Sequence, residues 1–241
     1  MNKSKIDLEE LAKKIFVSKS IFQPNLTSQL SCETAILKIK KNFKVLDLGC
    51  GSGIIGIAIM KNFNNIRMYC SDLDKKSVKI AKNNFIKHKL IADVREGNLF
   101  NPWKGKRFDY IINDVSGISS IIAKKSVWFM NKVPCNSGKD GTDLTISVIK
   151  ESPIYLTKKG LIQIPLISLS NVKKVVKIAK RNFSEINIIK SKDWFLPPGM
   201  ENLLKIMNKL KLKKYINFEK KFGRIICNTS IAVCRKPRIY Q

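Results

Sequence analysis

Histidine, acidic side chains and long apolar stretches are scarce in this chain of 241 residues. It has 18 Asp and Glu residues against 46 Lys and Arg residues, and its one histidine is His88. The apolar run from Ile54 to Met60 is far shorter than the about 18 residues that a membrane span requires. The first seven residues contain no apolar stretch of the kind found in signal peptides. We therefore expect a cytoplasmic protein with no membrane segment.

Clustered metal ligands are also absent. The six cysteines form no Cys-x-x-Cys pair and stand far from His88 in the sequence; they are Cys32, Cys50, Cys70, Cys135, Cys227 and Cys234. A zinc site needs several Cys or His ligands close together, so no metal is expected. Disulfides are not expected in a chain without a secretion signal. Most of these cysteines should be small buried apolar residues.

The formal charge of +28 is the strongest compositional bias. A polyanionic partner is one explanation, because lysine-rich faces bind phosphates through release of counterions. The alternative is a general bias toward Lys, Ile and Asn that leaves solvated basic faces without a partner. Two lysine-rich segments stand out, at residues 173–181 and 205–214.

Short apolar segments alternate with amphipathic segments along most of the chain. Strands are expected at 45–48, 66–71, just before Val94, and at 108–113, 161–167, 186–190 and 225–234. Helices are expected at 4–16, near 33–39, and at 54–63, 75–87, 142–155 and 172–183. This alternation predicts an α/β fold with a mostly parallel sheet and helices on both faces. Residues 1–43 should form a small N-terminal helical cap, and residues 44–241 the main domain.

A glycine-rich turn follows the first expected strand, with the sequence Asp47-Leu48-Gly49-Cys50-Gly51-Ser52-Gly53. Ligands of such sheets bind beyond the carboxyl ends of the strands, and glycines let the backbone approach them closely. The spacing from Gly51 to Gly56 also matches the dinucleotide fingerprint. The carboxylate of Asp47 would repel a pyrophosphate but attract an ammonium group. A nucleoside that carries an amino acid therefore fits better than NAD, and a dinucleotide oxidoreductase is the less favoured alternative.

Two aspartates follow the second expected strand. Asp72 lies 21 residues after Gly51, a spacing at which an acid accepts hydrogen bonds from ribose hydroxyls. Asp74 directly precedes the next helix and is expected to be its N-cap.

Several segments, in order, resemble class I S-adenosylmethionine-dependent methyltransferases. The resemblance is closest to the "methyltransferase small" group, which includes the release-factor glutamine methyltransferases. It extends over roughly residues 33–166. The matching segments are 45–53, Cys32-Glu33-Thr34-Ala35, Asp72 with Ala81-Lys82-Asn83-Asn84, Gly97-Asn98-Leu99-Phe100, Phe108–Asn113 and Gly138-Lys139-Asp140-Gly141.

The resemblance implies a Rossmann-like, mostly parallel seven-stranded sheet and S-adenosyl-L-methionine as cofactor. It assigns cofactor contacts to Phe22, Thr34, Asp47, Gly49, Gly51, Gly53, Asp72, Leu73, Asn98, Leu99 and Asn113. Asn98 stands where the family usually has an aspartate that binds the adenine amino group. An amide oxygen accepts the same hydrogen bond without the assistance of charge.

The chain departs from the family where the family has Asn-Pro-Pro-Tyr. Here Asn113 is followed by Asp114-Val115-Ser116, so both prolines and the aromatic residue are missing. In the family this motif holds a planar amide or an exocyclic amino group. The methyl acceptor therefore stays open between a protein side chain, RNA and a small metabolite.

Asn113 and Asp114 are the candidate catalytic residues. We expect the Asn113 side chain to face the methyl group of the cofactor. Asp114 either orients or deprotonates the acceptor, or only caps the turn before Gly117. Trp128, Phe129 and residues 194–198 are candidates for the wall of an acceptor pocket, or for core. Phe22 is a candidate lid over the cofactor, and His88 should lie at the surface.

The sequence thus predicts a methyltransferase with an unidentified acceptor. RNA or a ribosomal or translation protein is a possible partner, because the chain is basic. The alternative is a nonenzymatic binding protein that keeps the fold and a basic nucleic-acid-binding surface.

Overall fold

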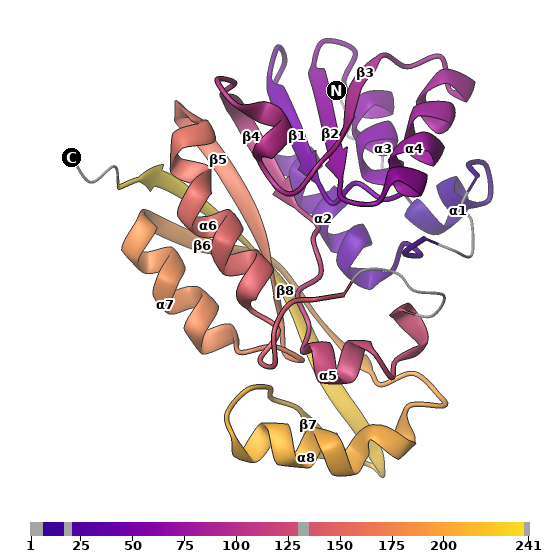
Figure 1. Ribbon diagram of the computed structural model, residues 1–241, viewed down its shortest axis with the longest axis vertical. Coiled ribbons are helices and arrows are strands. Elements are labelled where there is room, and N and C mark those ends of the chain that lie inside the picture. The colour runs from indigo at the N-terminus through magenta and orange to yellow at the C-terminus, as the bar shows by residue number, and fades with distance from the viewer. Residues whose placement is uncertain (1–6, 17–20, 130–134, 239–241) are drawn as a thin grey trace.

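The computed structural model describes residues 7–16, 21–129 and 135–238, and its centre is a twisted sheet (Figure 1). The strands of this sheet are β1 (Lys44–Leu48), β2 (Arg67–Asp72), β3 (Ala92–Glu96), β4 (Phe108–Asn113), β5 (Leu156–Ile167), β6 (Phe183–Phe195), β7 (Glu219–Lys221) and β8 (Arg224–Pro237). Their order is β3-β2-β1-β4-β5-β8-β6, and β7 pairs with β8 outside this path. The first five strands are parallel, and β8 runs antiparallel to both β5 and β6.

The expected Rossmann-like α/β architecture is confirmed, with one strand more than the predicted seven. The additional strand is β7, which has three residues, all of them exposed. It has the sequence Glu-Lys-Lys, which carries no apolar alternation and therefore no strand signal.

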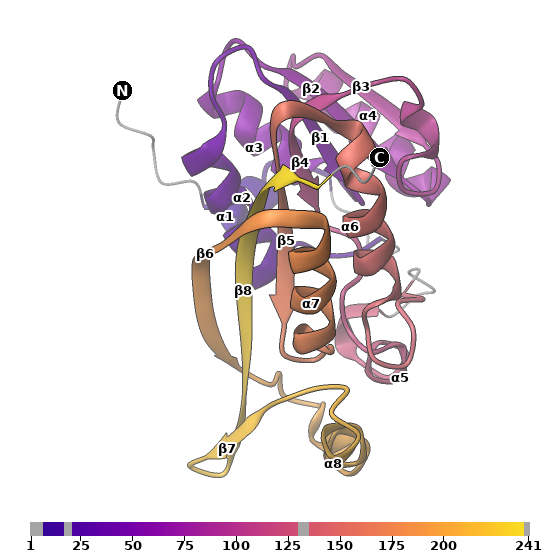
Figure 2. The same cartoon turned by 90° about the vertical axis from the view of Figure 1, so that its left-hand side faces the viewer.

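Helices cover both faces of the sheet (Figure 2). They are α1 (Leu8–Ala12), α2 (Leu26–Lys38), α3 (Ile54–Asn62), α4 (Lys75–Lys87), α5 (Ser120–Ala123), α6 (Asp143–Tyr155), α7 (Val172–Asn182) and α8 (Leu204–Leu212). Helices α1 to α4 share one core with the β1 and β4 residues Val45 and Ile112. Helices α6 and α7 share a second core with Leu46 and Ile111. Side chains alternate along a strand, so neighbouring residues of β1 and β4 belong to opposite cores.

The N-terminal helices pack into the core of the sheet domain. Leu8 and Leu11 of α1 and Ala35 of α2 are buried in the same cluster as α3. Helix α2 begins at Leu26, earlier than expected, because the Asn25 side chain accepts hydrogen bonds from the N–H groups of Thr27 and Ser28 and so caps the helix. The division at residue 43 stays a prediction.

The strands β6 and β8 are longer than expected and extend past the other strands. Ile167, the last residue of β5, pairs with Thr229, whereas Phe195 of β6 pairs with Ile226. The extended part of this hairpin carries α8 and β7, which lie together at one end of the molecule (Figure 2). Among the described residues, no helix has the length and apolar character needed to cross a membrane.

Gly141 permits a close crossing of two loops beside the carboxyl edge of the sheet. Its φ is +73°, and a Cβ atom there would lie 2.4 Å from the Ser119 nitrogen and 2.5 Å from the Ile118 carbonyl carbon. Gly223 has a similar φ of +70°, but a Cβ atom there would meet nothing within 4 Å.

Gly141→Ala is therefore expected to destabilise the protein more than Gly223→Ala. Both variants strain a left-handed backbone, which costs roughly 1–2 kcal/mol. Only Gly141→Ala adds a steric clash, which costs about 1–3 kcal/mol more. Urea unfolding of the two variants measures the difference, and equal losses of unfolding free energy would contradict the close crossing.

Candidate active-site pocket

A pocket of about 360 Å³ lies where the carboxyl ends of β1, β2 and β4 meet. It is also lined by residues 21–28, which lead into α2, and by the segment that follows β4. Ligand pockets of α/β sheets form at this edge because the chain turns away from the sheet there. The structure thus places a pocket at the position that the glycine-rich turn predicts.

The turn after β1 is held in place by the carboxylate of Asp72. The Gly51 N–H donates to Oδ2 of Asp72 at 2.9 Å, and the Asp74 N–H donates to Oδ1 at 2.9 Å. Gly49 and Gly51 both have positive φ, and a Cβ atom on Gly51 would meet nothing within 4 Å. The Gly51 backbone therefore faces open space in the pocket. Burial raises the pKa of Asp72, although the backbone hydrogen bonds oppose this effect.

The prediction that Asp74 caps α4 is confirmed. Its carboxylate accepts hydrogen bonds from the Ser77 N–H at 3.0 Å and the Ser77 hydroxyl at 2.9 Å. Asp74 also lines the pocket.

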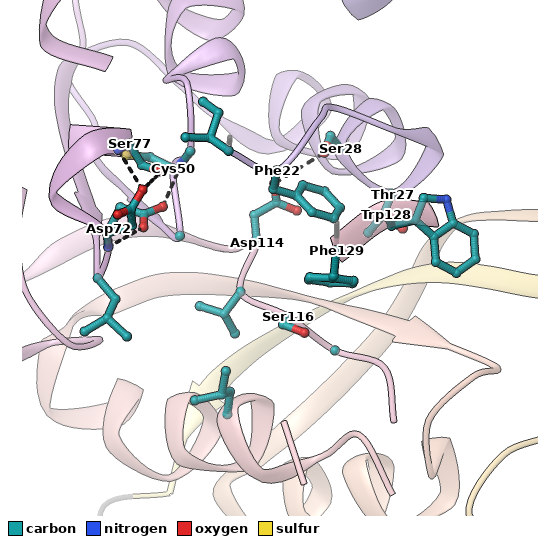
Figure 3. Close-up of a pocket in the computed structure, with 18 of the residues that line it drawn as sticks. Phe22, Thr27, Ser28, Cys50, Asp72, Ser77, Asp114, Ser116, Trp128 and Phe129 are labelled. Carbon is teal, nitrogen blue, oxygen red and sulfur yellow. Dashed lines mark hydrogen bonds between the residues drawn. The ribbon is translucent and has the colours of Figure 1, made fainter. Parts of the chain in front are cut away.

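Asp114 is the first residue after β4, and its side chain enters the pocket (Figure 3). Its N–H donates to the Leu48 carbonyl at 2.9 Å, which continues the pairing of β1 and β4 by one residue. Its Oδ2 accepts a long hydrogen bond of 3.4 Å from the Ser28 hydroxyl of α2. Burial, with a further contribution from the Asp72 charge, raises the pKa of Asp114 to about 7.

Asn113 is not among the residues that line the pocket, and the expectation that its side chain faces the cofactor stays a prediction. It is fully buried, and neither side-chain polar atom has a hydrogen-bond partner within the described part of the chain. Alternation along β4 places Asn113 on the same face as Ile111, toward the core that contains α6, and turns Asp114 to the opposite face. The residues after β4 that line the pocket are Asp114, Val115, Ser116 and Gly117.

The other predicted cofactor residues divide into two groups. Those that line the pocket are Phe22, Gly49, Gly51, Asp72, Leu73, Asn98 and Leu99. Thr34, Asp47 and Gly53 are not among the residues that line it. Asp47 is fully buried, and neither of its carboxylate oxygens has a partner among the described residues. Burial raises the pKa of Asp47, and the charges of Asp114 and Asp72 raise it further.

Aromatic side chains line the end of the pocket next to Asp114 (Figure 3). The ring centroids of Phe22 and Phe129 are 5.2 Å apart, and those of Trp128 and Trp194 are 5.7 Å apart. Both ring pairs lie within the range of favourable aromatic contacts. The expected wall is therefore present in Trp128, Phe129 and Trp194, but residues 195–198 do not line the pocket.

Several polar residues that line the pocket were not identified as site residues from the sequence. They are Asn25, Thr27, Ser28, Ser71, Ser77, Ser116 and Asn136. For Ser71 and Ser116 a signal existed, because both stand next to the carboxyl end of an expected strand. Asn25 and Ser28 gave no such signal, because they reach the pocket only through the packing of α2 against the sheet.

His88 does not line this pocket, and Cys50 is the one cysteine among its described lining residues. His88 is half-buried at the C-cap of α4. All six cysteines are free, and five of them are buried. Within the described ranges, no group of three Cys, His, Asp or Glu residues is arranged to hold a metal ion.

The charges that line the pocket are of one sign. Among the described residues, its lining includes Asp72, Asp74 and Asp114 but no Lys, Arg or His. In a chain with 46 basic residues and 18 acidic ones, this distribution favours a positively charged ligand.

Comparisons with known proteins agree with this geometry. The model of the methyltransferase small domain matches residues 27–114. A release factor glutamine methyltransferase from Clostridium botulinum is 31% identical over 157 residues, which cover 61% of this chain and 55% of that protein. The chain thus spans about half the length of the first curated relatives that it matches.

A solved structure and a further relative complete the comparison. The ribosomal protein L11 methylase of Lactobacillus delbrueckii subsp. bulgaricus has the same fold, with a TM-score of 0.56, 16% identity, and coverage of 91% of this chain and 84% of that one. A putative protein N5-glutamine methyltransferase from Methanocaldococcus jannaschii is 32% identical over 149 residues, which cover 60% of this chain and 74% of that protein. From this relative and the matching domain model, we conclude that the chain belongs to the methyltransferase small domain family.

Proposed function

We propose that this protein is an S-adenosylmethionine-dependent methyltransferase. The observation that carries the proposal is the pocket lining, which includes three aspartates and, in the described chain, no cationic side chain. S-adenosylmethionine bears a sulfonium and an ammonium group, which such a lining attracts. A dinucleotide pyrophosphate would be repelled. The names of the relatives, which are protein methyltransferases, support the same function.

The residues of the pocket fit the parts of this cofactor. The Asp72 oxygens accept backbone hydrogen bonds from Gly51 and Asp74 and, as a carboxylate has about four lone-pair sites, can also accept from ribose hydroxyls. The open backbone at Gly51 leaves room for the amino-acid portion. Leu73 and Leu99 provide apolar contacts for the adenine ring, and Asn98 offers an amide oxygen to its amino group.

When bound, S-adenosylmethionine supplies an activated methyl group for an in-line displacement. The contribution of this chain is to hold the acceptor in line and to receive its proton. Asp114 is placed for both tasks, because it lies between the Asp72 side of the pocket and the aromatic end (Figure 3). Phe22, Phe129 and Trp128 exclude water around the acceptor.

The acceptor of this chain differs from the glutamine named for its relatives. An ionised Asp114 offers only hydrogen-bond acceptors, whereas a carboxamide presents two N–H donors with a carbonyl oxygen beside them. The carbonyl oxygen and the carboxylate are both hydrogen-bond acceptors, so they would repel each other. An amino group without an attached carbonyl avoids this repulsion, so we assign the methyl acceptor as an amine nitrogen.

Transfer of labelled methyl groups tests the proposed function. The purified protein is incubated with methyl-labelled S-adenosylmethionine and cell extract, and the label is measured in protein, RNA and small molecules. We expect incorporation in one fraction. A protein that binds S-adenosylhomocysteine but labels no fraction would instead be the nonenzymatic alternative.

Asp72→Ala should weaken S-adenosylhomocysteine binding by about 10- to 150-fold, because it removes hydrogen bonds to a charged acceptor worth roughly 1.5–3 kcal/mol. Asp109→Ala is the matched control, because Asp109 does not line the pocket and its carboxylate also accepts two hydrogen bonds, from the Lys44 N–H and the Thr157 hydroxyl. It loses stability but no ribose contact, so its affinity should change little. Calorimetry measures both constants, and equal affinities of the Asp72 variant and the wild type would contradict the assignment.

Asp114→Asn retains the shape of the side chain and removes its charge and basicity. If Asp114 receives the acceptor proton, turnover should fall about 10²- to 10⁴-fold while the affinity for S-adenosylhomocysteine stays nearly constant. Steady-state kinetics and calorimetry provide the two readouts. Unchanged turnover would show that Asp114 only caps the turn, because asparagine caps almost as well.

The stability of Asp114→Asn should also depend on pH relative to the wild type. Folded Asp114 has a pKa of about 7, above its ordinary value of 3.8, so between these values the folded state binds a proton that the unfolded state has lost. Wild-type stability therefore falls as pH rises through this window. The variant lacks this loss. Its free energy of unfolding relative to that of the wild type, measured with urea, should therefore increase by about 2–4 kcal/mol between pH 4 and pH 8. If the difference in free energy of unfolding did not change with pH, the Asp114 carboxyl group would be exposed to water and not buried.

A further inference from the structure

The segment from residue 200 to residue 224, called the basic lobe below, is an appendage of the sheet that lies next to the pocket. It comprises α8 and β7, which the extended ends of β6 and β8 carry beyond β5. Trp194 of β6 lines the pocket and pairs with Cys227 of β8. The neighbouring residue of β8, Ile226, pairs with β7, so the lobe and the pocket are adjacent. Ile118 and Leu169 of the pocket share a buried cluster with Met207 and Leu210 of α8.

The charge of the basic lobe is mostly positive and exposed to solvent. Between residues 200 and 224 there are eight basic residues and two acidic ones. Lys205, Lys209 and Lys213 are spaced by four residues and are all exposed, whereas Met207 and Leu210 of the same helix are buried. Among the described residues, no carboxylate forms an ion pair with any of these three lysines.

Aromatic rings are interleaved with these charges. Phe222 stands at the turn between β7 and β8 and is 97% exposed, between Lys221 and Arg224. The Arg224 guanidinium lies 3.8 Å from the ring centroid of Phe195, which is itself 46% exposed. An aromatic face beside cations is the arrangement that stacks a base and neutralises its phosphate. Protein interfaces, in contrast, are depleted in lysine at their centres.

We infer that the basic lobe binds single-stranded RNA, and that a base of this RNA presents the amine that enters the pocket. The assignment of that base as the methyl acceptor rests on the proposed function. The pocket suits an unstacked base because the rings of Phe22, Phe129 and Trp128 line the pocket on one side of Asp114 (Figure 3), and Trp194 contacts Trp128 in the same wall. Lysines of the lobe hold the phosphates outside the pocket, away from its aspartates.

Fluorescence anisotropy with a labelled single-stranded RNA of about 20 nucleotides tests this inference, since one site covers roughly 4–16 nucleotides. The test variant is Lys205→Gln with Lys209→Gln and Lys213→Gln. Its matched control is Lys173→Gln with Lys177→Gln and Lys180→Gln, which removes the same charge from exposed positions of α7. We expect the lobe variant to bind at least tenfold more weakly and to lower the log–log salt slope by about 2, while the control changes affinity by less than threefold.

Phe222→Ala provides a second readout, because stacking does not depend on salt in the same way as charge. It should weaken RNA binding about fivefold or more and leave the salt slope unchanged. Equal losses in the two lysine variants, no binding at low salt, or displacement of RNA by polyglutamate of equal charge would overturn the inference. S-adenosylhomocysteine affinity, unchanged in all three variants, shows that they are folded.

The labelled-methyl experiment separates this inference from the proposed function. Label that is removed by ribonuclease and lost in the lobe variant supports both. Label in protein that survives ribonuclease keeps the methyltransferase and overturns the RNA acceptor. Binding of RNA through the lobe without binding of S-adenosylhomocysteine overturns the proposed function and leaves the lobe as an RNA-binding surface.

Discussion

The Asp72 carboxylate ties together the two loops on which the pocket depends. One oxygen binds the Gly51 N–H in the turn after β1, and the other binds the Asp74 N–H at the start of α4. These bonds fix the glycine turn against the end of β2, while Asp114 pairs with Leu48 on the other side of β1. Three neighbouring strand ends are thereby held in one arrangement. The positions of Asp72, Asp74 and Asp114 in the pocket follow from that arrangement.

Much of the fold followed from the sequence, because the parallel strands are short apolar runs separated by amphipathic helices. The bounds of β4 agree with the expected 108–113, and Asp74 caps α4 as expected. β7 and α5 escaped prediction because they are short and owe their geometry to neighbours rather than to periodicity. The lengths of β6 and β8 escaped for a different reason, since polar residues continue both strands past their apolar centres.

The site was predictable where a motif determines backbone geometry, and less so where packing determines which face a side chain takes. Asp72, Gly51 and Asp114 were found from the strand ends. Asp114 lines the pocket and Asn113 does not, because a shift of one residue along a strand reverses the face on which a side chain lies. Ser28 contacts Asp114 across 86 positions of sequence, and no local pattern encodes such a contact.

The position of β8 between β5 and β6 has a consequence for how the chain folds during synthesis. β6 is complete at Phe195, but its partner begins only at Arg224 and ends at Pro237. At about 5–20 residues per second, the ribosome needs some seconds to produce that partner. During this delay the thirteen-residue strand β6 and the edge of β5 both expose unpaired backbone groups. The nascent chain is therefore most prone to aggregate, and most in need of a chaperone, just before its last strand emerges.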